Sequence, residues 1–167
     1  MDADLIALSE AVGSAALARS GQRRLLLATA ESCTGGWVAQ VITHTSGSSE
    51  WFERGFVTYS NEAKTELLGV RPETIENYGA VSPETAGAMA EGALKNSKAL
   101  IALSITGIAG PTGGSPGKPV GTVCFAWCRV GETAETETAV FAGDREAVRR
   151  QAVVHALRGL LVRLDAR

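Results

Sequence analysis

The chain passes from an apolar strand through a short polar turn into a helix near residue 30, and this passage constrains the fold more than any other segment. Residues 25–29 (LLLAT) form an apolar run typical of a buried strand. Residues 30–36 (AESCTGG) then bring two hydroxyls, a thiol and two glycines, and residues 37–42 (WVAQVI) favour a helix. In open α/β sheets, ligands bind where strands end and helices begin. The turn is therefore either a catalytic or phosphate-binding loop, or simply a helix cap with a glycine turn.

The other predicted elements alternate between strands and helices. Apolar spacing predicts further helices over residues 4–19, 37–45, 62–68, 83–95 and from 145 onward, a helical turn from 71, and further strands over 55–59, 99–105, 121–129 and 136–141. Gly21 is expected to end the first helix. Asn61, Ser82 and Asp144 are expected to cap later helices. This alternation, which ends in a hairpin and a helix, predicts a single α/β domain over residues 1–167, with three α/β/α layers and a mixed sheet.

The composition restricts the classes of partner. The 167 residues are 45% hydrophobic and 20% charged, with a formal charge of −2, which suits one ordinary apolar core. Because the chain has no basic stripe and only 5% aromatic residues, we expect no nucleic-acid partner. No apolar run approaches the roughly 18 residues of a membrane span, and the N-terminus lacks a secretory signal. We therefore expect a cytoplasmic protein without a membrane partner.

The sequence offers no metal-binding pattern and no clear histidine base. Its three cysteines are odd in number and outside any zinc spacing, so we expect a reduced chain without a metal or cofactor. Of the two histidines, His44 falls at the end of a predicted helix and His155 inside the last one. Neither lies in a motif that would orient an imidazole toward Ser32, which argues against a Ser-His-Asp triad. No P-loop or dinucleotide-binding glycine pattern is present either.

A serine nucleophile without histidine needs another base, and Lys64 is the candidate. Lys64 closes residues 59–64 (YSNEAK), just past the second predicted strand. If that strand neighbours the first, its carboxyl end brings Lys64 near Ser32. A lysine acts as a base only when neutral, which requires desolvation or a nearby cation. Tyr59 could relay the proton or bind substrate. The residues alone, however, favour a solvated helix position for Lys64 and a half-buried strand position for Tyr59.

Three other side chains compete for the role of nucleophile. Cys33 adjoins Ser32, but it lacks a histidine partner and is expected to pack in the core. Ser48 and Ser49 lie in the loop before Trp51 and are weaker candidates.

Six motifs follow one another in an order that resembles a known family. They are residues 30–36 (AESCTGG), 47–49 (GSS), 55–64 (GFVTYSNEAK), 79–82 (GAVS), 106–111 (TGIAGP) and 118–123 (KPVGTV). Each motif alone is weak, but six in order with matching spacing are specific. The chain resembles the CinA C-terminal domain family in its stand-alone form, the nicotinamide-nucleotide amidohydrolases. The resemblance covers nearly the whole chain, and we expect no room within these 167 residues for the additional N-terminal domain of the larger CinA proteins.

The resemblance implies an activity and roles for three residues. The family hydrolyses the carboxamide of nicotinamide mononucleotide to nicotinate mononucleotide and ammonia, and so recycles the pyridine nucleotide without a metal or a nucleoside triphosphate. Carried over to this sequence, the family's Ser/Lys pair makes Ser32 the nucleophile and Lys64 the base, with Tyr59 in support.

The oxyanion and the substrate phosphate each need donors. Backbone N–H groups of Thr34, Gly35 and Gly36, or of the loop from Gly107 to Gly110, are expected to hold the oxyanion.

The phosphate is expected to bind Thr106, the same glycine-rich loop and Arg145, although Arg145 also suits a surface helix position. Ser48 is a further candidate for a substrate contact.

Two other functions remain open at this point. One is a nucleotide-binding regulatory module without catalysis, as the family's link to competence and damage induction suggests. The other is hydrolysis of a different small amide or of the dinucleotide. In each case we expect a small-molecule partner and a homo-oligomer, a dimer or larger.

Overall fold

The parallel half of the sheet carries the turn on which the sequence analysis centres. In the computed structural model, which describes residues 1–166, β1 (Leu27–Glu31) lies between β2 (Phe52–Val57) and β3 (Ile101–Gly107) and pairs in parallel with both. All five residues of β1 are buried, as expected for a central strand that is covered on both faces. The carboxyl ends of the three strands therefore meet at one end of the sheet.

The other half of the sheet is antiparallel. β4 (Thr122–Arg129) runs antiparallel to β3, and β5 (Glu135–Val140) runs antiparallel to β4. The strand order is thus β2-β1-β3-β4-β5. The hairpin that precedes the last helix and the mixed sheet agree with the prediction.

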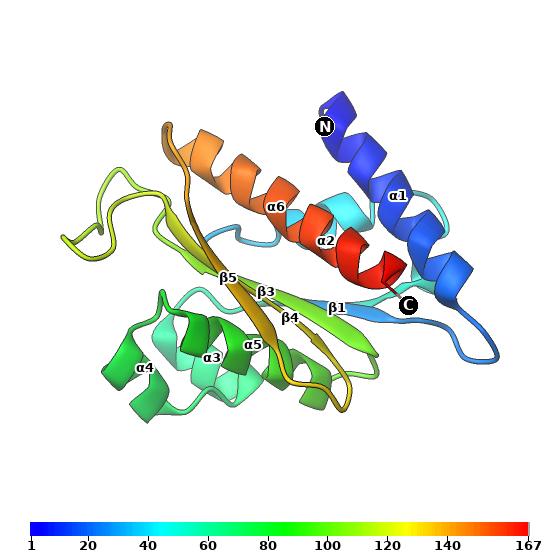
Figure 1. The fold of residues 1–167 in the computed structure, drawn as a ribbon, viewed down its shortest axis with the longest axis horizontal. Coiled ribbons are helices and arrows are strands. Elements are labelled where there is room, and N and C mark those ends of the chain that lie inside the picture. Colours follow the sequence, from blue (N-terminus) through cyan, green and yellow to red (C-terminus); the bar gives the residue numbers. More distant parts are fainter. Residues whose placement is uncertain (167) are drawn as a thin grey trace.

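Helices cover both faces of the sheet and give the three predicted layers (Figure 1). One face carries α1 (Ala3–Arg19), α2 (Trp37–Ile42) and α6 (Arg145–Asp165), and the other carries α3 (Asn61–Leu68), α4 (Pro72–Tyr78) and α5 (Pro83–Lys95). The largest apolar cluster packs between the sheet and the first set, with Trp127 and Leu157 among its members. Two clusters rich in alanine pack under the second set.

Small residues on α5 let α3 come close to it. A side chain at Gly92 of α5 would collide with the carbonyl oxygen of Leu68, the last residue of α3. Because α3 carries Lys64, this close helix contact helps to set the height of Lys64 above the sheet.

Several element boundaries differ from the prediction. β1 lies two residues further along the chain than predicted, β2 starts at Phe52 rather than residue 55, β3 ends at Gly107 rather than 105, and α2 ends at Ile42 rather than 45. The apolar runs include residues that lead into a strand, so they mark the strand but not its ends. As a result Glu31 closes β1, and Ser32 is the first residue after it.

Two of the predicted helix ends were also wrong. The cap of α3 is Ser60, whose side chain accepts a hydrogen bond from the Ala63 N–H, and Asn61 is already the first helical residue. The first helix ends at Arg19 with Ser20 in an extended conformation, so Gly21 does not supply a left-handed stop. Ser82 and Asp144 do cap α5 and α6, as predicted.

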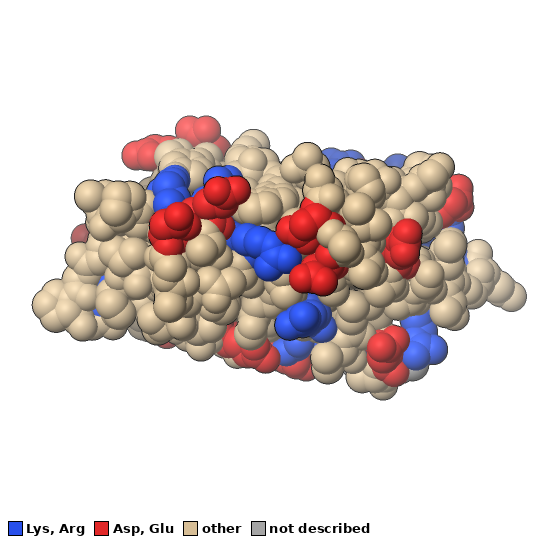
Figure 2. Space-filling model, turned by 90° about the horizontal axis from the view of Figure 1, so that it is seen from above, with Lys and Arg blue, Asp and Glu red and all other residues tan. Residues whose placement is uncertain are grey.

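The face formed by the α1 and α6 layer carries charges of both signs (Figure 2). Arg150 on α6, for example, pairs with Asp2 at 2.9 Å and with Asp4 at 3.4 Å. Within residues 1–166, no helix combines the length and the apolar character that crossing a bilayer requires.

Candidate active site

Ser32 and Lys64 meet at the carboxyl end of the parallel strands. Ser32 follows β1, and its backbone N–H donates to the carbonyl oxygen of Ile105 in β3 at 2.9 Å. Lys64 lies in α3, which follows β2. Because β1 and β2 are parallel neighbours, as the hypothesis required, Lys64 Nζ lies 3.0 Å from Ser32 Oγ. The pair therefore has the distance that a nucleophile and its base need.

The burial of Lys64 favours its neutral form. Its side chain is only 1% exposed, and Nζ also donates to the backbone carbonyls of Thr58 at 2.9 Å and Tyr59 at 3.2 Å. Burial lowers the pKa of Lys64 below its ordinary value of 10.5, because a buried ammonium loses its hydration. None of the ion pairs found among residues 1–166 involves Lys64. This is the desolvated lysine that the sequence hypothesis required.

The neighbouring thiol is inert in comparison. Cys33 is 5% exposed, and burial raises its pKa to about 12. Since the thiolate is the reactive form, Cys33 stays protonated at neutral pH. It packs in the main core cluster, as predicted.

The turn that carries Ser32 is tied down by charged side chains on two sides. The fully buried carboxylate of Glu31 accepts hydrogen bonds from Thr34 Oγ1 at 2.7 Å and from the backbone N–H groups of Val38 at 2.8 Å and Ala39 at 3.1 Å. From α6, Arg149 donates to the carbonyl oxygens of Cys33 at 3.0 Å and Thr34 at 3.2 Å. The turn between β1 and α2 is thus held by Glu31, the last residue of β1, and by Arg149 from α6.

A cavity of about 250 Å³ opens over the Ser32–Lys64 pair. It is lined by Ser32, Cys33, Tyr59, Asn61, Lys64, Ala80, Val81, Thr106, Gly107, Ile108, Ala109, Gly110, Thr112, Gly113 and Arg145. Seven residues predicted for the site are in this set, namely Ser32, Lys64, Tyr59, Thr106, Gly107, Gly110 and Arg145. Ser32 and Cys33 of the first turn and residues 106–110 of the second loop therefore face a single cavity.

Arg145 and Tyr59 form one side of the cavity. Arg145 Nη1 donates to the carbonyl oxygen of Gly110 at 2.8 Å, and Nη2 donates to the Tyr59 hydroxyl at 3.0 Å. The Tyr59 side chain is 60% exposed, and its phenol contacts Arg145, while its backbone carbonyl contacts Lys64. Thr106, which also lines the cavity, is buried and donates its hydroxyl proton to the Ala80 carbonyl at 2.7 Å.

Comparison with known proteins places the chain in a family. Residues 9–164 match the model of the CinA C-terminal domain. The chain belongs to the CinA C-terminal domain family.

Two relatives differ in how much of their length this CinA domain covers. The chain is 57% identical over 159 residues to nicotinamide-nucleotide amidohydrolase PncC of Escherichia coli K12, and the match covers 95% of this chain and 94% of that protein. It is 51% identical over 146 residues to a CinA-like protein of Akkermansia muciniphila, covering 87% of this chain but 34% of that protein.

Solved structures of the CinA superfamily share the fold. A competence-damaged protein (CinA) superfamily protein from Klebsiella pneumoniae superposes with a TM-score of 0.91 at 40% identity, covering 98% of this chain and 99% of that chain. A competence/damage inducible protein from Agrobacterium tumefaciens gives a TM-score of 0.90 at 40% identity, with 99% and 98% covered.

The geometry of this CinA domain does not agree with four of the expected substrate contacts. Thr34, Gly35 and Gly36 are absent from the lining of the cavity. Thr34 Oγ1 donates to Glu31 at 2.7 Å, and the Gly35 N–H donates to the Ser32 carbonyl at 3.0 Å, so these two groups help to close the turn. Gly36 is the N-cap residue of α2.

Ser48, the fourth, lies at the far end of the sheet in the 3₁₀ helix Ser48–Glu50, which precedes β2. The whole of β1, about 16 Å of strand, separates that end from Ser32.

Sequence reasoning missed Glu31, Arg149 and Asn61. Glu31 stood inside the first motif, and an acidic residue next to a predicted helix start was a usable signal. Asn61 stood between Tyr59 and Lys64 in the third motif but was interpreted only as a helix cap. Arg149 gave no such signal, because the helix that brings it to the turn is distant from Ser32 in the chain.

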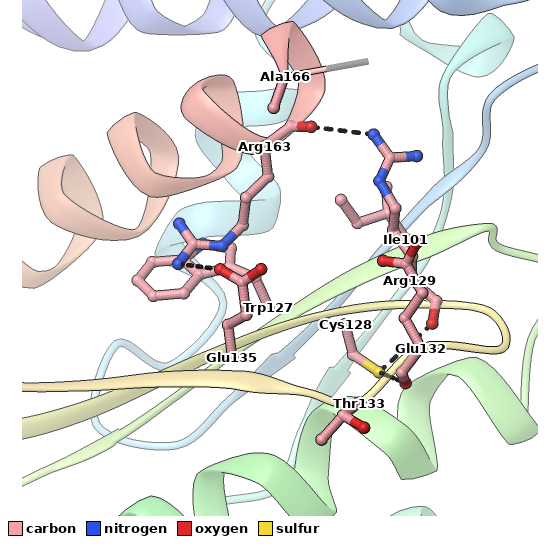
Figure 3. A pocket seen from close by; sticks show the side chains of 9 residues that line it. All are labelled: Ile101, Trp127, Cys128, Arg129, Glu132, Thr133, Glu135, Arg163 and Ala166. Carbon is pink, nitrogen blue, oxygen red and sulfur yellow. Dashed lines mark hydrogen bonds and ion pairs between the residues drawn. The ribbon is translucent and has the colours of Figure 1, made fainter.

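A second cavity, of about 280 Å³, lies at the other end of the sheet (Figure 3). There Arg163 lies over the ring of Trp127, 3.9 Å from its centroid, and pairs with Glu135 at 2.9 Å. Burial raises the pKa of its one thiol, Cys128. With no activated nucleophile in its lining, this cavity is a poorer candidate for catalysis than the one over Ser32. No cluster within residues 1–166 has the side chains to hold a metal ion.

Proposed function

We propose that this protein is a nicotinamide-nucleotide amidohydrolase that converts nicotinamide mononucleotide to nicotinate mononucleotide and ammonia. The observation that carries the proposal is the 3.0 Å contact between Ser32 Oγ and the buried Lys64 Nζ at the floor of a cavity. The 57% identity to a protein named for this activity supports the choice of substrate. An amide is also the substrate class that a serine with an amine base suits.

The backbone around Lys64 orients its lone pair. A neutral amine has two N–H donors and one lone pair. The carbonyls of Thr58 and Tyr59 accept both N–H groups, so the lone pair is left for the hydroxyl proton of Ser32. The same carbonyls stabilise the ammonium that forms when Lys64 takes this proton.

The reaction then proceeds through an acyl-enzyme. Ser32 Oγ attacks the carboxamide carbon while its proton moves to Lys64 Nζ. The resulting ammonium returns the proton to the amide nitrogen as the C–N bond breaks, and ammonia leaves. In the second half, Lys64 takes a proton from water as the water oxygen attacks the ester. It then protonates Ser32 Oγ, and the nicotinate carboxyl group is released.

The oxyanion is best held by N–H groups that line the cavity. Among residues 1–166, the backbone N–H groups of Ala109 and Gly110 donate to no protein acceptor. Both residues line the cavity, as does Cys33, the residue after the nucleophile. Each oxyanion donor of this kind is typically worth about 3 kcal/mol of transition-state stabilisation. We therefore favour the glycine-rich loop and the residue after the nucleophile over the start of α2.

Arg145 is the proposed anchor of the substrate phosphate, with Thr106 in support. Replacing Arg145 by alanine is expected to raise KM for the mononucleotide by about 10- to 100-fold, the value of one charged hydrogen bond. KM for nicotinamide riboside, which lacks the phosphate, should change little. Steady-state ammonia release from both substrates measures this, with Arg145→Lys as the matched control that keeps the charge but loses the planar fork. Equal KM values for wild type and Arg145→Ala on the mononucleotide would contradict the assignment.

The function itself is tested by ammonia release from nicotinamide mononucleotide in the presence of EDTA. Turnover in chelator, faster than with the riboside, free nicotinamide or the dinucleotide, is the expected result. A preference for another amide would change the substrate assignment and keep the Ser/Lys chemistry. Tight binding of the mononucleotide without turnover would favour a regulatory module instead.

The proposal also includes the working state of the enzyme. In this proposal the enzyme needs a small-molecule substrate and no cofactor, and it acts in the cytoplasm as a homo-oligomer. Tyr59 lines the cavity, and Val57 is the last residue of the edge strand β2. Both side chains are large, apolar and exposed, which supports a contact between two copies of the protein at this place.

A further inference from the structure

We propose that Glu31 and Arg149 are positioning residues that hold the Ser32 turn in its reactive geometry. The inference rests on the proposed function only in taking Ser32 as the nucleophile. Neither side chain lines the cavity, so neither is expected to touch the substrate. Both act on the backbone on either side of Ser32.

Glu31 supplies the cap that α2 otherwise lacks. α2 has only six residues, and its N-cap, Gly36, is in the left-handed region at φ 99° without a side-chain hydrogen bond. So short a helix is marginal on its own, and its first N–H groups need acceptors. The Glu31 carboxylate accepts from the N–H groups of Val38 and Ala39, and thereby ties the end of β1 to the start of α2.

The same contact decides which anion the helix start can bind. A helix N-terminus attracts negative charge and would suit a substrate phosphate. Here the chain's own carboxylate occupies that place at 0% exposure. The loop between Glu31 and Val38 is consequently closed, with the Gly35 N–H on the Ser32 carbonyl and the Trp37 N–H on the Thr34 carbonyl, each at 3.0 Å. Ser32, the first residue of this closed loop, has little freedom to move away from Lys64.

Arg149 holds the outer side of the loop. Its guanidinium, placed by α6, binds the Cys33 and Thr34 carbonyls and lies 5.6 Å from the centroid of the Trp37 ring. A Cβ at Gly35 would come within 3.4 Å of Arg149 Nη2. Gly35 itself adopts a left-handed conformation at φ 59°, which a side chain would strain. The loop is therefore clamped between the sheet and α6.

The catalytic consequence follows from distance. The contact between Ser32 Oγ and Lys64 Nζ depends on both partners being held, and a displacement of about 1 Å can cost on the order of 100-fold in rate. In Glu31→Gln, one carboxylate oxygen is replaced by an NH₂ group. This group then faces at least one N–H or O–H donor from which the carboxylate now accepts a hydrogen bond, and that bond is lost. We expect kcat for the mononucleotide to fall about 100-fold while KM stays within about twofold. Arg149→Met is expected to lower kcat by about 10-fold with the same pattern, because it removes only the outer contacts.

A control variant separates positioning from general destabilisation. Leu164 is fully buried at the end of α6, roughly 28 Å along the helix from Arg145. Leu164→Ala is expected to lower the melting temperature at least as much as Glu31→Gln and to keep wild-type kcat once the folded fraction is counted. A loss of kcat in Glu31→Gln that the folded fraction accounts for, or a loss of the same size in Leu164→Ala, would overturn the proposal.

A second measurement reads the nucleophile without the nicotinamide substrate. The rate of covalent labelling of Ser32 by a fluorophosphonate, followed by mass spectrometry, should fall in Glu31→Gln and Arg149→Met and stay unchanged in Leu164→Ala. If the wild type is labelled in this Glu31-dependent way but does not deamidate the mononucleotide, the proposed function fails and the positioning role stands. Wild-type labelling rates in both variants would overturn the positioning role even if deamidation is established.

Discussion

Ser32→Ala is expected to lower ammonia release from nicotinamide mononucleotide by at least about 10⁴-fold, because no second nucleophile can take over. The oxygen that attacks the amide is removed, while the rest of the cavity stays intact. The nearest alternative is the Cys33 thiol, whose pKa is raised to about 12 by burial, so its thiolate is scarce at neutral pH. Substrate binding, measured by calorimetry, should remain within a few fold of the wild type.

Cys33→Ala is the matched control for this prediction. It removes the neighbouring side chain from the same turn and should retain most of the wild-type kcat, although it leaves a small cavity in the core. Activity that survives in Ser32→Ala and disappears in Cys33→Ala would assign the nucleophile to the thiol. Activity that survives in both variants would place the chemistry elsewhere in the chain.

The sequence carried enough information to pair Ser32 with Lys64. Both follow the carboxyl ends of strands that the apolar pattern revealed, and in a parallel sheet such ends lie together. The strand order was a hypothesis, and the observed pairing of β1 with β2 confirmed it. Ser48 fails by the same rule, because it precedes its strand instead of following it.

The clamp around the nucleophile could not have been derived in the same way. The carboxylate of Glu31 bends back onto the helix that follows it, which only the positions of Val38 and Ala39 reveal. Arg149 reaches the turn because α6 packs beside α2 and over β3 and β4. Contacts of this kind depend on the angle and height at which helices pack, and apolar periodicity sets neither.

Lys64→Met is expected to abolish turnover and also to stabilise the protein at neutral pH relative to the wild type. The apolar side chain fills a similar volume without the cost of keeping an amine away from water. It gives up the hydrogen bonds to the Thr58 and Tyr59 carbonyls, which offsets part of the gain. Lys64→Arg, which stays charged, should be inactive as well and less stable than either. Chemical denaturation and steady-state assays measure both properties.

The pH dependence of these properties distinguishes a desolvated base from an ordinary lysine. The pKa of Lys64 in the folded protein lies below its ordinary value of 10.5, so the unfolded chain binds more protons between the two values. Wild-type stability therefore contains a contribution that rises with pH across this window. The advantage of Lys64→Met should accordingly be largest below the folded-state pKa and shrink as the pH rises toward 10.5.

Activity should follow the same ionisation, because only the neutral amine accepts the Ser32 proton. We expect kcat/KM of the wild type to rise with pH along a single ionisation, which reports the pKa of Lys64 in the free enzyme. The midpoint of this rise should lie below 10.5, the ordinary pKa of a lysine. If the stability difference between Lys64→Met and the wild type is independent of pH over this range, Lys64 is not desolvated in solution. The base would then have to be another group, since a fully solvated lysine is almost entirely protonated at neutral pH. If the two profiles share one midpoint, the burial that costs the fold stability is also what keeps Lys64 neutral and able to accept the Ser32 proton.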